Sequence, residues 1–477
     1  MKLAGMASNR GRNLMNIADR APGGATLSVV LTNDDDAPVL GKARERGIPA
    51  ESVVRSAGQS RREHERHVLD ALADHEFDLV CLDGYMRILS DTFLDRAPTT
   101  LNVHPSLLPA FPGADAWGDA LDAGVSVTGC TVHVVTDATD DDGAVIEEHI
   151  DAGPIVTQEP IPVYGGDTRE TLKERVLYAG EFRAYPRAVR WFADGRVRVD
   201  RDANRVHVEG DTGGRFPERR LASHDHAVTL RYGENPHQAA ALYAEPTGGP
   251  TAASTAESAS EPSVVTAEQL NEGAKGMSYN NYNDADAALA LIREFDEPAA
   301  AVIKHTNPAG CATADSLVAA YERALATDPM SAFGGIVALN RPCDAPTAEA
   351  IVDSFKEVVV APGYTDDALD VLSTRENLRV LDVGPFATPG ADAAGESGEP
   401  PLVENHLVGG RLLQERDEQH LPRQDLAVVT EREPTDEQVE TMLFAWQTLK
   451  HVKSNGILLA KGTETVGIGM GQVSRVD

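Results

Sequence analysis

Asn102 and His104 are two side chains that could together polarise a carbonyl group. They lie in Leu101–Pro109, a segment that starts with an apolar pattern and closes with two prolines. Side chains on a strand alternate between its faces, so this pair is expected to project from one side. An amide donor and a protonated imidazole suit the charge that develops on a carbonyl oxygen. The pair alone does not establish a site, because most isolated histidines are structural or solvated.

Lys304 and His305 are a second candidate pair, at the end of the apolar run Ala300–Ile303. An adjacent lysine and histidine before a turn could share acid–base work. Repulsion from the lysine would keep the histidine neutral and favour it as a base. A bare Lys-His pair is usually a surface feature, so other residues must support this assignment.

An anion site is possible near the N-terminus, where the apolar run Lys2–Ala7 leads through Gly11 into a helical pattern. Free N–H groups at the start of a helix point toward such a ligand, and Arg10 or Arg12 could add positive charge. With one glycine, an ordinary strand-to-helix turn explains the segment equally well.

The elements around these residues alternate between strand and helix patterns. Apolar runs at 27–33 and 78–82 flank helical patterns, the longer of which covers 61–74. Repeated units of this kind predict an α/β fold with a doubly wound, mostly parallel sheet. Ligands of such sheets bind beyond the carboxyl ends of the strands, where the Gly11 loop and Asn102 would meet.

The composition is strongly acidic and poor in lysine. The 477 residues, enough for about three domains, carry a formal net charge of −32, and only nine of the 43 basic residues are lysine. This pattern indicates a globular protein kept soluble at high salt, from a halophilic source. The charge disfavours nucleic acids and anionic membranes as partners.

The four cysteines show no metal-ligand spacing and are expected to be buried in a reducing compartment. No apolar run reaches membrane-spanning length, and the N-terminus lacks a signal-peptide core. We therefore expect a cytoplasmic protein. The predicted organisation is a first domain at 1–200, a polar linker at 201–227 and a second domain at 228–477, with surface loops at 245–263 and 384–401.

A set of motifs in the first domain resembles glycinamide ribonucleotide formyltransferase, a folate-dependent purine enzyme. The set comprises Met86-Arg87-Ile88-Leu89, then Asn102 and His104, His133, and Asp151-Ala152-Gly153-Pro154, in that order. The resemblance covers nearly all of residues 1–200 and implies the formyltransferase fold.

The resemblance implies a role for each matching residue. Asn102 and His104 would stabilise the oxyanion while Asp151 accepts a proton, through water, from the attacking amine. The co-substrate would be 10-formyltetrahydrofolate, with no metal. The substrate phosphate would lie at Gly11, Arg12 and Asn13, the ribose at Glu181, and the folate against Met86, Arg87, Ile88 and Leu89.

Two features depart from that family. Arg12 replaces a small hydroxyl residue, which could change the phosphate contacts. An extra acidic loop, Asp140-Asp141-Asp142-Gly143, leaves the choice of catalytic aspartate open. Asp151 is preferred because Gly153-Pro154 follows it.

The second domain resembles AICAR formyltransferase, which has a cytidine-deaminase-like α/β fold. Its motifs are Arg231-Tyr232-Gly233-Glu234-Asn235-Pro236-His237-Gln238, Lys304-His305 with Pro308 and Gly310, Asp328–Gly335, Lys453-Ser454-Asn455 and Gly467–Arg475. By resemblance Lys304 and His305 are catalytic, and the nucleotide is held by Arg231, Tyr232, Glu357 and Asn455. The family works as a homodimer, so a homodimer is implied.

Two absences qualify the second resemblance. The family usually places an IMP cyclohydrolase domain where residues 1–200 stand, so no cyclohydrolase activity is expected. The family also continues beyond the Gly467–Arg475 motif, so the sequence is expected to be a fragment or to have an incomplete second site.

The leading hypothesis is a purine-biosynthesis enzyme that formylates glycinamide ribonucleotide and AICAR. A 10-formyltetrahydrofolate hydrolase would share the first trio but usually carries a further domain in front. Methionyl-tRNA formyltransferase would need a nucleic-acid-binding tail, which the acidic charge disfavours. A third reading keeps the first domain active and makes the second a dimerisation scaffold.

Overall fold

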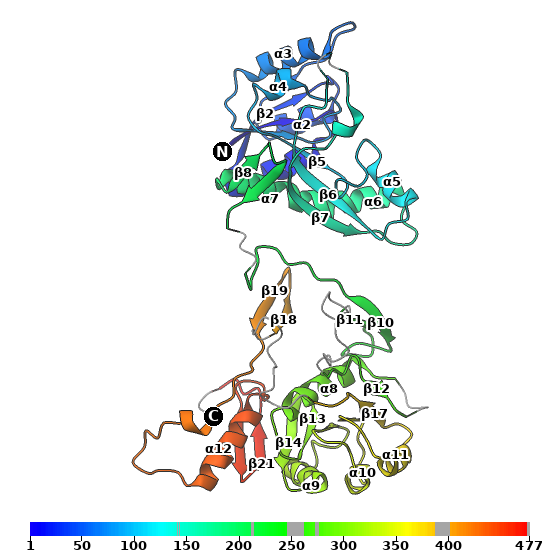
Figure 1. Cartoon of the computed structure of the whole chain (residues 1–477), viewed down its shortest axis with the longest axis vertical. Coiled ribbons are helices and arrows are strands. Elements are labelled where there is room, and N and C mark those ends of the chain that lie inside the picture. The colour runs from blue at the N-terminus through cyan, green and yellow to red at the C-terminus, as the bar shows by residue number, and fades with distance from the viewer. Residues whose placement is uncertain are drawn as a thin grey trace. The chain divides into compact units, whose positions relative to one another are not determined.

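A computed structural model describes residues 1–140, 142, 144–210, 214–245, 262–271, 276–386 and 401–474. Within these residues the chain forms two compact units, Met1–Arg220 and Leu221–Asp477 (Figure 1). Most of the loops predicted at 245–263 and 384–401 lies outside the described residues. So do Asp141 and Gly143 of the acidic loop and Arg475 of the last motif.

The first unit is built on a seven-stranded sheet in the order β3-β2-β1-β4-β5-β6-β7. Strands β1 to β5 pair in parallel, whereas β6 and β7 are antiparallel. The doubly wound, mostly parallel sheet predicted from the sequence is confirmed. The strands are β1 (Lys2–Met6), β2 (Thr26–Thr32), β3 (Ala50–Ser52), β4 (Leu79–Leu82), β5 (Thr100–His104), β6 (Val127–Val134) and β7 (Ile155–Pro162).

Helices cover both faces of this sheet because its inner strands are apolar on both sides. Leu3 faces a core formed with α1, α2 and α7, while its neighbour Ala4 faces a core formed with α3 and α4. The helices are α1 (Arg12–Arg20), α2 (Pro38–Glu45), α3 (Arg61–Leu72), α4 (Asp91–Leu94), α5 (Ala116–Asp122), α6 (Arg169–Arg175) and α7 (Phe182–Ala193). A π-helical turn, Val176–Glu181, joins α6 to α7.

Part of the interval predicted as a linker belongs to the first unit. Strand β8 (Val197–Asp200) pairs with β9 (Arg205–Val208) in a hairpin. Further on, Glu218 accepts a hydrogen bond of 2.9 Å from Trp191 Nε1 and pairs with Arg196 at 2.6 Å. These contacts fasten the end of the unit to α7.

The second unit contains an eight-stranded mixed sheet in the order β12-β17-β16-β15-β13-β14-β21-β20. Its strands are β12 (Glu268–Gln269), β13 (Ala299–Lys304), β14 (Asn307–Thr313), β15 (Ile336–Leu339), β16 (Val358–Ala361), β17 (Arg379–Asp382), β20 (Ile457–Lys461) and β21 (Glu464–Gly469). Two hairpins stand apart from this sheet, β10 (Asp225–Leu230) with β11 (Ala240–Ala244) and β18 (Leu402–Leu407) with β19 (Gly410–Glu415).

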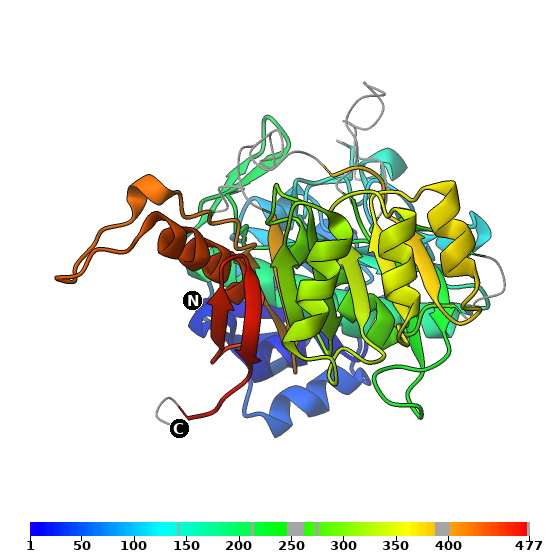
Figure 2. The same cartoon turned by 90° about the horizontal axis from the view of Figure 1, so that it is seen from below.

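Helices again lie on both faces. Alternate residues of β13 divide between two cores, so Ala301 packs with α8 and Val302 packs with α9, α10 and α11. Figure 2 shows α12 beside β20 at one end of the sheet. The helices are α8 (Tyr279–Ile292), α9 (Leu317–Thr327), α10 (Ala345–Val352), α11 (Asp366–Ser373) and α12 (Asp436–Leu449).

All four cysteines are buried and unbonded, as the sequence predicts. In the described part of the chain, no helix combines the length and apolarity that crossing a membrane requires.

The fully buried Tyr185 supports the sheet between the last residue of β4 and the start of β5. Its hydroxyl lies 2.9 Å from the carbonyl oxygen of Leu82 and 3.0 Å from that of Leu101. We expect Tyr185→Phe to lower the free energy of unfolding of the first unit by about 1–3 kcal/mol, because buried carbonyls lose their donor. Denaturant unfolding measures this change. Tyr178→Phe, at an exposed ring, is the control and should unfold like the wild type.

Candidate functional site

The register of β5 against β6 gathers four polar side chains on one face. Asn102 lies opposite His133, and His104 lies opposite Thr131. Directly opposed residues of an antiparallel pair share a face, and so do residues two apart on one strand. The neighbouring Val103 faces the core instead.

Asp151 reaches this face from the turn that precedes β7. Its backbone is left-handed, with φ of 56°. The turn crosses β6 so closely that a Cβ at Gly153 would lie 1.8 Å from the carbonyl oxygen of Val134. Only glycine permits that approach. The Asp-x-Gly-Pro spacing thus places the carboxylate over the polar face.

Asp151 lies between two histidines. Its Oδ2 is 3.1 Å from His104 Nδ1, and its Oδ1 is 3.6 Å from His133 Nε2. The amide nitrogen of Asn102 lies 3.1 Å from the same His133 nitrogen. The structure therefore brings together Asn102, His104 and Asp151, as the sequence predicts, and adds His133.

The electrostatics of this group keep Asp151 ionised. Burial alone would raise the pKa of its carboxyl group, but hydrogen bonds and charge from His104 and His133 outweigh burial and hold the pKa well below its usual range. Gly113 N–H also donates to Oδ2, at 3.3 Å.

Both ring nitrogens of the buried His104 face acceptors. Nδ1 faces Asp151, and Nε2 lies 2.8 Å from the carbonyl oxygen of Phe111. Only a doubly protonated imidazole can donate to both. The Phe111 loop is held by Thr131, whose hydroxyl donates to Ser106 O at 2.7 Å and accepts from Leu108 N at 3.0 Å.

A cavity opens in front of this group. Among its lining residues are Asn102, His133 and Asp151, together with Arg87, Ile88 and Leu89 of the predicted folate segment. Met86 does not line it, and its side chain is 67% exposed.

A larger cavity, of about 440 Å³, lies at the start of α1. It is lined by Gly11, Arg12 and Asn13 together with Glu181, so the residues predicted to bind the nucleotide share one space. Gly11 is left-handed, with φ of 55°, and a Cβ there would lie 2.3 Å from Val39. This glycine lets α1 begin at the cavity wall without a capping side chain.

The cavity lies at the switch point of the sheet, where β1 and β4 adjoin and the strand order reverses. Asp83, which follows β4, accepts hydrogen bonds from Asn13 N at 2.7 Å and from Asn13 Nδ2 at 3.0 Å. Asn13 Nδ2 also donates to Glu181 Oε2 at 2.6 Å. One amide thus joins two carboxyl groups beside the helix start.

These carboxyl groups have unusual acidity. Burial raises the pKa of Glu181 to about 7; the hydrogen bond from Asn13 opposes this rise, and the nearby Asp83 adds to it. Burial also raises the pKa of Asp83, against its hydrogen bonds from Asn13. Arg12 stands close by, over the ring of Tyr178 at 5.9 Å.

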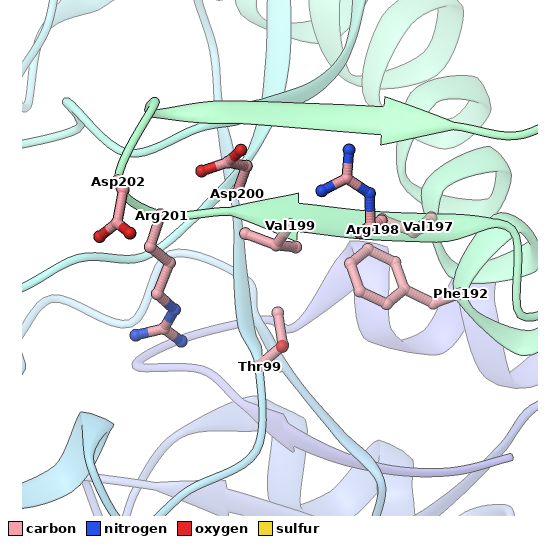
Figure 3. A pocket seen from close by; sticks show the side chains of 8 residues that line it. All are labelled: Thr99, Phe192, Val197, Arg198, Val199, Asp200, Arg201 and Asp202. Carbon is pink, nitrogen blue, oxygen red and sulfur yellow. The ribbon is translucent and has the colours of Figure 1, made fainter.

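A third hollow of the first unit holds none of the predicted site residues. It is lined by Thr99, Phe192 and residues 197–202, which form β8 and part of the turn after it (Figure 3). Thr99 precedes β5, so this hollow adjoins the amino end of that strand, away from His104 at its carboxyl end.

In the second unit, Lys304 ends β13 and its Nζ donates to Phe333 O at 2.8 Å. Phe333 belongs to the predicted Asp328–Gly335 motif. His305 and Thr306 then form a turn with φ of 53° and 62°. Asp284 of α8 accepts from both backbone N–H groups, at 3.1 and 2.7 Å.

The predicted nucleotide residues of this unit fall into two groups. Arg231 stacks over Tyr232 at 5.3 Å, and both act electrostatically on Arg379, whose pKa is lowered by burial despite the nearby Glu357. Glu357 Oε2 is 3.8 Å from Arg379 and accepts from Asn281 at 2.8 Å.

Asn455 lies on the segment that meets the Lys304-His305 turn. Its Nδ2 donates to Gln472 O at 3.0 Å. Asn307 Oδ1 accepts from Lys453 N at 3.0 Å, while Asn307 Nδ2 donates to His305 O at 2.9 Å. Asn307 therefore ties the two segments together.

The site residues predicted from the sequence omit Asp83, Arg379 and Asp284, and His133 appears there only as part of a motif without a role. His133 carries a signal, since an imidazole stands out in the apolar strand 127–134. The other three are ordinary charged residues in the sequence, and only their tertiary contacts distinguish them. Among the described residues, no cluster of His, Cys, Asp and Glu is suited to hold a metal ion.

Comparisons with known proteins also divide the chain into two parts, with the boundary at 189–198 rather than at the unit boundary after Arg220. Residues 198–477 match the family model described as AICARFT/IMPCHase bienzyme, and residues 1–189 match the formyl transferase model. The bifunctional purine biosynthesis protein PurH of Paracoccus denitrificans is 47% identical over 273 residues, 57% of this chain and 47% of that protein. The chain thus spans about half the length of the curated relatives it matches.

Solved structures are similar to part of the chain. Glycinamide ribonucleotide transformylase 1 of Symbiobacterium toebii is 39% identical, covers 44% of this chain and 93% of its own, and gives a TM-score of 0.39. The phosphoribosylglycinamide formyltransferase of Brucella melitensis is also 39% identical, with 42% and 98% coverage and a TM-score of 0.36.

The pKa of Glu181 predicts a pH-dependent stability. Because it rises to about 7 from 4.5 on folding, wild-type stability should fall as pH rises through that window. The glutamine of Glu181→Gln cannot ionise, so the variant does not lose this stability. Its free energy of unfolding minus that of the wild type should therefore be larger at about pH 8 than at about pH 4, by roughly 3 kcal/mol. Unfolding at several pH values measures this. Glu174→Gln, an exposed residue of the same cavity, is the control; a pH-independent difference for Glu181→Gln would contradict the prediction.

Proposed function

This chain belongs to the AICARFT/IMPCHase bienzyme family, and we propose that it performs two formyl transfers of purine biosynthesis. The donor of both is 10-formyltetrahydrofolate. The first unit formylates the amine of glycinamide ribonucleotide, and the second formylates AICAR. The observation that carries the proposal is the contact of Asp151 with His104 and His133 beside Asn102.

Formyl transfer needs an oxyanion to be stabilised and a proton to be removed. As the amine attacks the formyl carbon, negative charge develops on the formyl oxygen. Asn102 offers amide hydrogens at the cavity wall, and the imidazolium of His104 supplies positive charge behind them. Asp151, which is ionised, accepts the amine proton through water. Collapse of the intermediate then returns a proton to the leaving nitrogen of tetrahydrofolate.

The two cavities of the first unit that contain predicted site residues suit the two substrates. The phosphate would lie against the N–H groups at Gly11 and Arg12, where the helix start favours an anion. Asn13 and Glu181 would meet the ribose. The folate would lie against Arg87, Ile88 and Leu89, with Met86 at the exposed margin of that surface.

In the second unit, His305 is the proposed base for the AICAR amine, and Lys304 the group that stabilises developing charge. Arg231, Tyr232, Glu357 and Asn455 are proposed to hold the nucleotide. Because a net charge of −32 disfavours polyanionic partners, we propose no nucleic-acid or membrane partner. A homodimer in the cytoplasm is the proposed working form.

One assay tests the proposal directly. The full chain is given 10-formyltetrahydrofolate with glycinamide ribonucleotide, with AICAR or with water alone, and tetrahydrofolate release is followed. We expect release with each nucleotide and none with water. Equal release in water would indicate a hydrolase, and turnover with only the first nucleotide would indicate that the second unit is a scaffold.

Asp151→Asn and His104→Ala should each lower kcat with glycinamide ribonucleotide by about 100-fold or more, since one removes the proton acceptor and the other the charge behind the oxyanion. Steady-state kinetics measure the loss. Asp142→Asn, in the exposed acidic loop, is the matched control and should keep wild-type turnover. If Asp142→Asn lost turnover and Asp151→Asn kept it, the proton acceptor would lie in the acidic loop instead.

Lys304→Ala and His305→Ala should abolish most AICAR formylation and leave turnover of glycinamide ribonucleotide within about twofold, because the two units carry separate polar groups. Assaying both nucleotides with each variant separates the sites. Equal loss of both reactions would contradict two independent active sites.

A further inference from the structure

Asp284 on α8 holds the turn that carries His305, although it lies outside the motifs that mark the second unit. Its Oδ2 accepts from His305 N–H at 3.1 Å, and its Oδ1 accepts from Thr306 N–H at 2.7 Å. Both carboxylate oxygens are thus used on consecutive backbone donors. Consecutive N–H groups of a turn form a natural anion-binding nest, and here the anion is a side chain.

The turn needs such support because its backbone is strained. His305 and Thr306 are both left-handed, with φ of 53° and 62°. Residues with a Cβ seldom adopt this conformation, and threonine is branched at Cβ. A conformation of this kind persists only where surrounding contacts impose it. The carboxylate of Asp284 stabilises the left-handed conformation by accepting hydrogen bonds from the backbone N–H groups of these same two residues.

The first turns of α8 place Asp284 accurately. Asn280, one helical turn before Asp284, donates to Glu234 O at 3.3 Å in the segment that follows Arg231 and Tyr232. Asn281 donates to Glu357 at 2.8 Å. The Ser278 capping box fixes where the helix begins. A single helix end therefore contacts three of the four segments that carry the predicted nucleotide and catalytic residues, all but that of Asn455.

From this geometry we propose that Asp284 is a positioning residue, which sets the direction of the His305 imidazole for formyl transfer to AICAR. The inference rests on the proposed function of the second unit. Asp284 touches backbone amides and not the side chains of Lys304 or His305, so its effect reaches the chemistry through the shape of the turn. Misplacing a catalytic group by about 1 Å typically costs a factor near 100 in rate.

Asp284→Asn is the informative variant. Asparagine has nearly the same shape as aspartate, but its amide nitrogen would replace one of the two carboxylate oxygens that accept hydrogen bonds. That nitrogen is itself a donor and would face the backbone N–H group of His305 or Thr306. We expect kcat for AICAR to fall roughly 10- to 100-fold while KM for AICAR stays within about twofold. Formylation of glycinamide ribonucleotide by the first unit should be unchanged and reports on the integrity of the chain. Asp315→Asn, which removes an exposed carboxylate beyond the far end of β14, is the matched control.

Two further measurements separate positioning from general stability. In a His305→Ala background, Asp284→Asn should cause little additional loss of AICAR turnover, because the group that it positions is already absent. Hydrogen exchange of the peptide that spans residues 304–307 should become at least about 10-fold faster in Asp284→Asn and not in Asp315→Asn.

The inference is overturned if exchange at 304–307 is unchanged, if kcat stays within twofold of wild type, or if the two substitutions are additive. Absence of AICAR formylation in the wild-type protein would instead refute the proposed function of the second unit. The exchange measurement would then still decide whether Asp284 holds the turn, because it requires no activity.

Discussion

The first site depends on one buried contact, the carboxylate of Asp151 between His104 and His133. Burial of a carboxylate is unfavourable unless charge and hydrogen bonds compensate, and here the imidazoles provide both. That contact requires the turn at Gly153 to pass so close to β6 that a Cβ at this position would clash with Val134 O. It also requires β5 and β6 to pair in one register. A slip of one residue would send Asn102 and His104 into the core face.

Both units use a carboxylate to bind backbone N–H groups beside a candidate site. In the first unit Asp83 accepts from the first turn of α1, and in the second Asp284 accepts from the turn after β13. Each carboxylate occupies backbone donors that would otherwise be open to solvent or ligand. The two contacts are similar because the physical problem is the same: backbone N–H groups need an acceptor where the regular hydrogen bonding of a helix or strand is absent.

The buried carboxyl groups around Asn13 show what such a site costs. Burial raises the pKa of both Asp83 and Glu181, and that of Glu181 to about 7, so folding makes Glu181 hold a proton that an unfolded chain would release. These residues therefore lower the free energy of unfolding at neutral pH, and they line the cavity proposed to bind the ribonucleotide. Arg12 supplies compensating positive charge, which lowers the pKa of both groups.

Local pattern in the sequence determined the layered α/β architecture and the strand that carries Asn102 and His104, because alternation and helical periodicity encode burial along one stretch of chain. Motif order pointed to the two formyltransferase families. Only the tertiary structure decided which polar groups meet: His133 beside Asn102, Asp83 at Asn13, Asp284 beneath the Lys304-His305 turn. Those contacts join segments far apart in the chain, and they follow from strand register and close loop crossings, which no local pattern specifies.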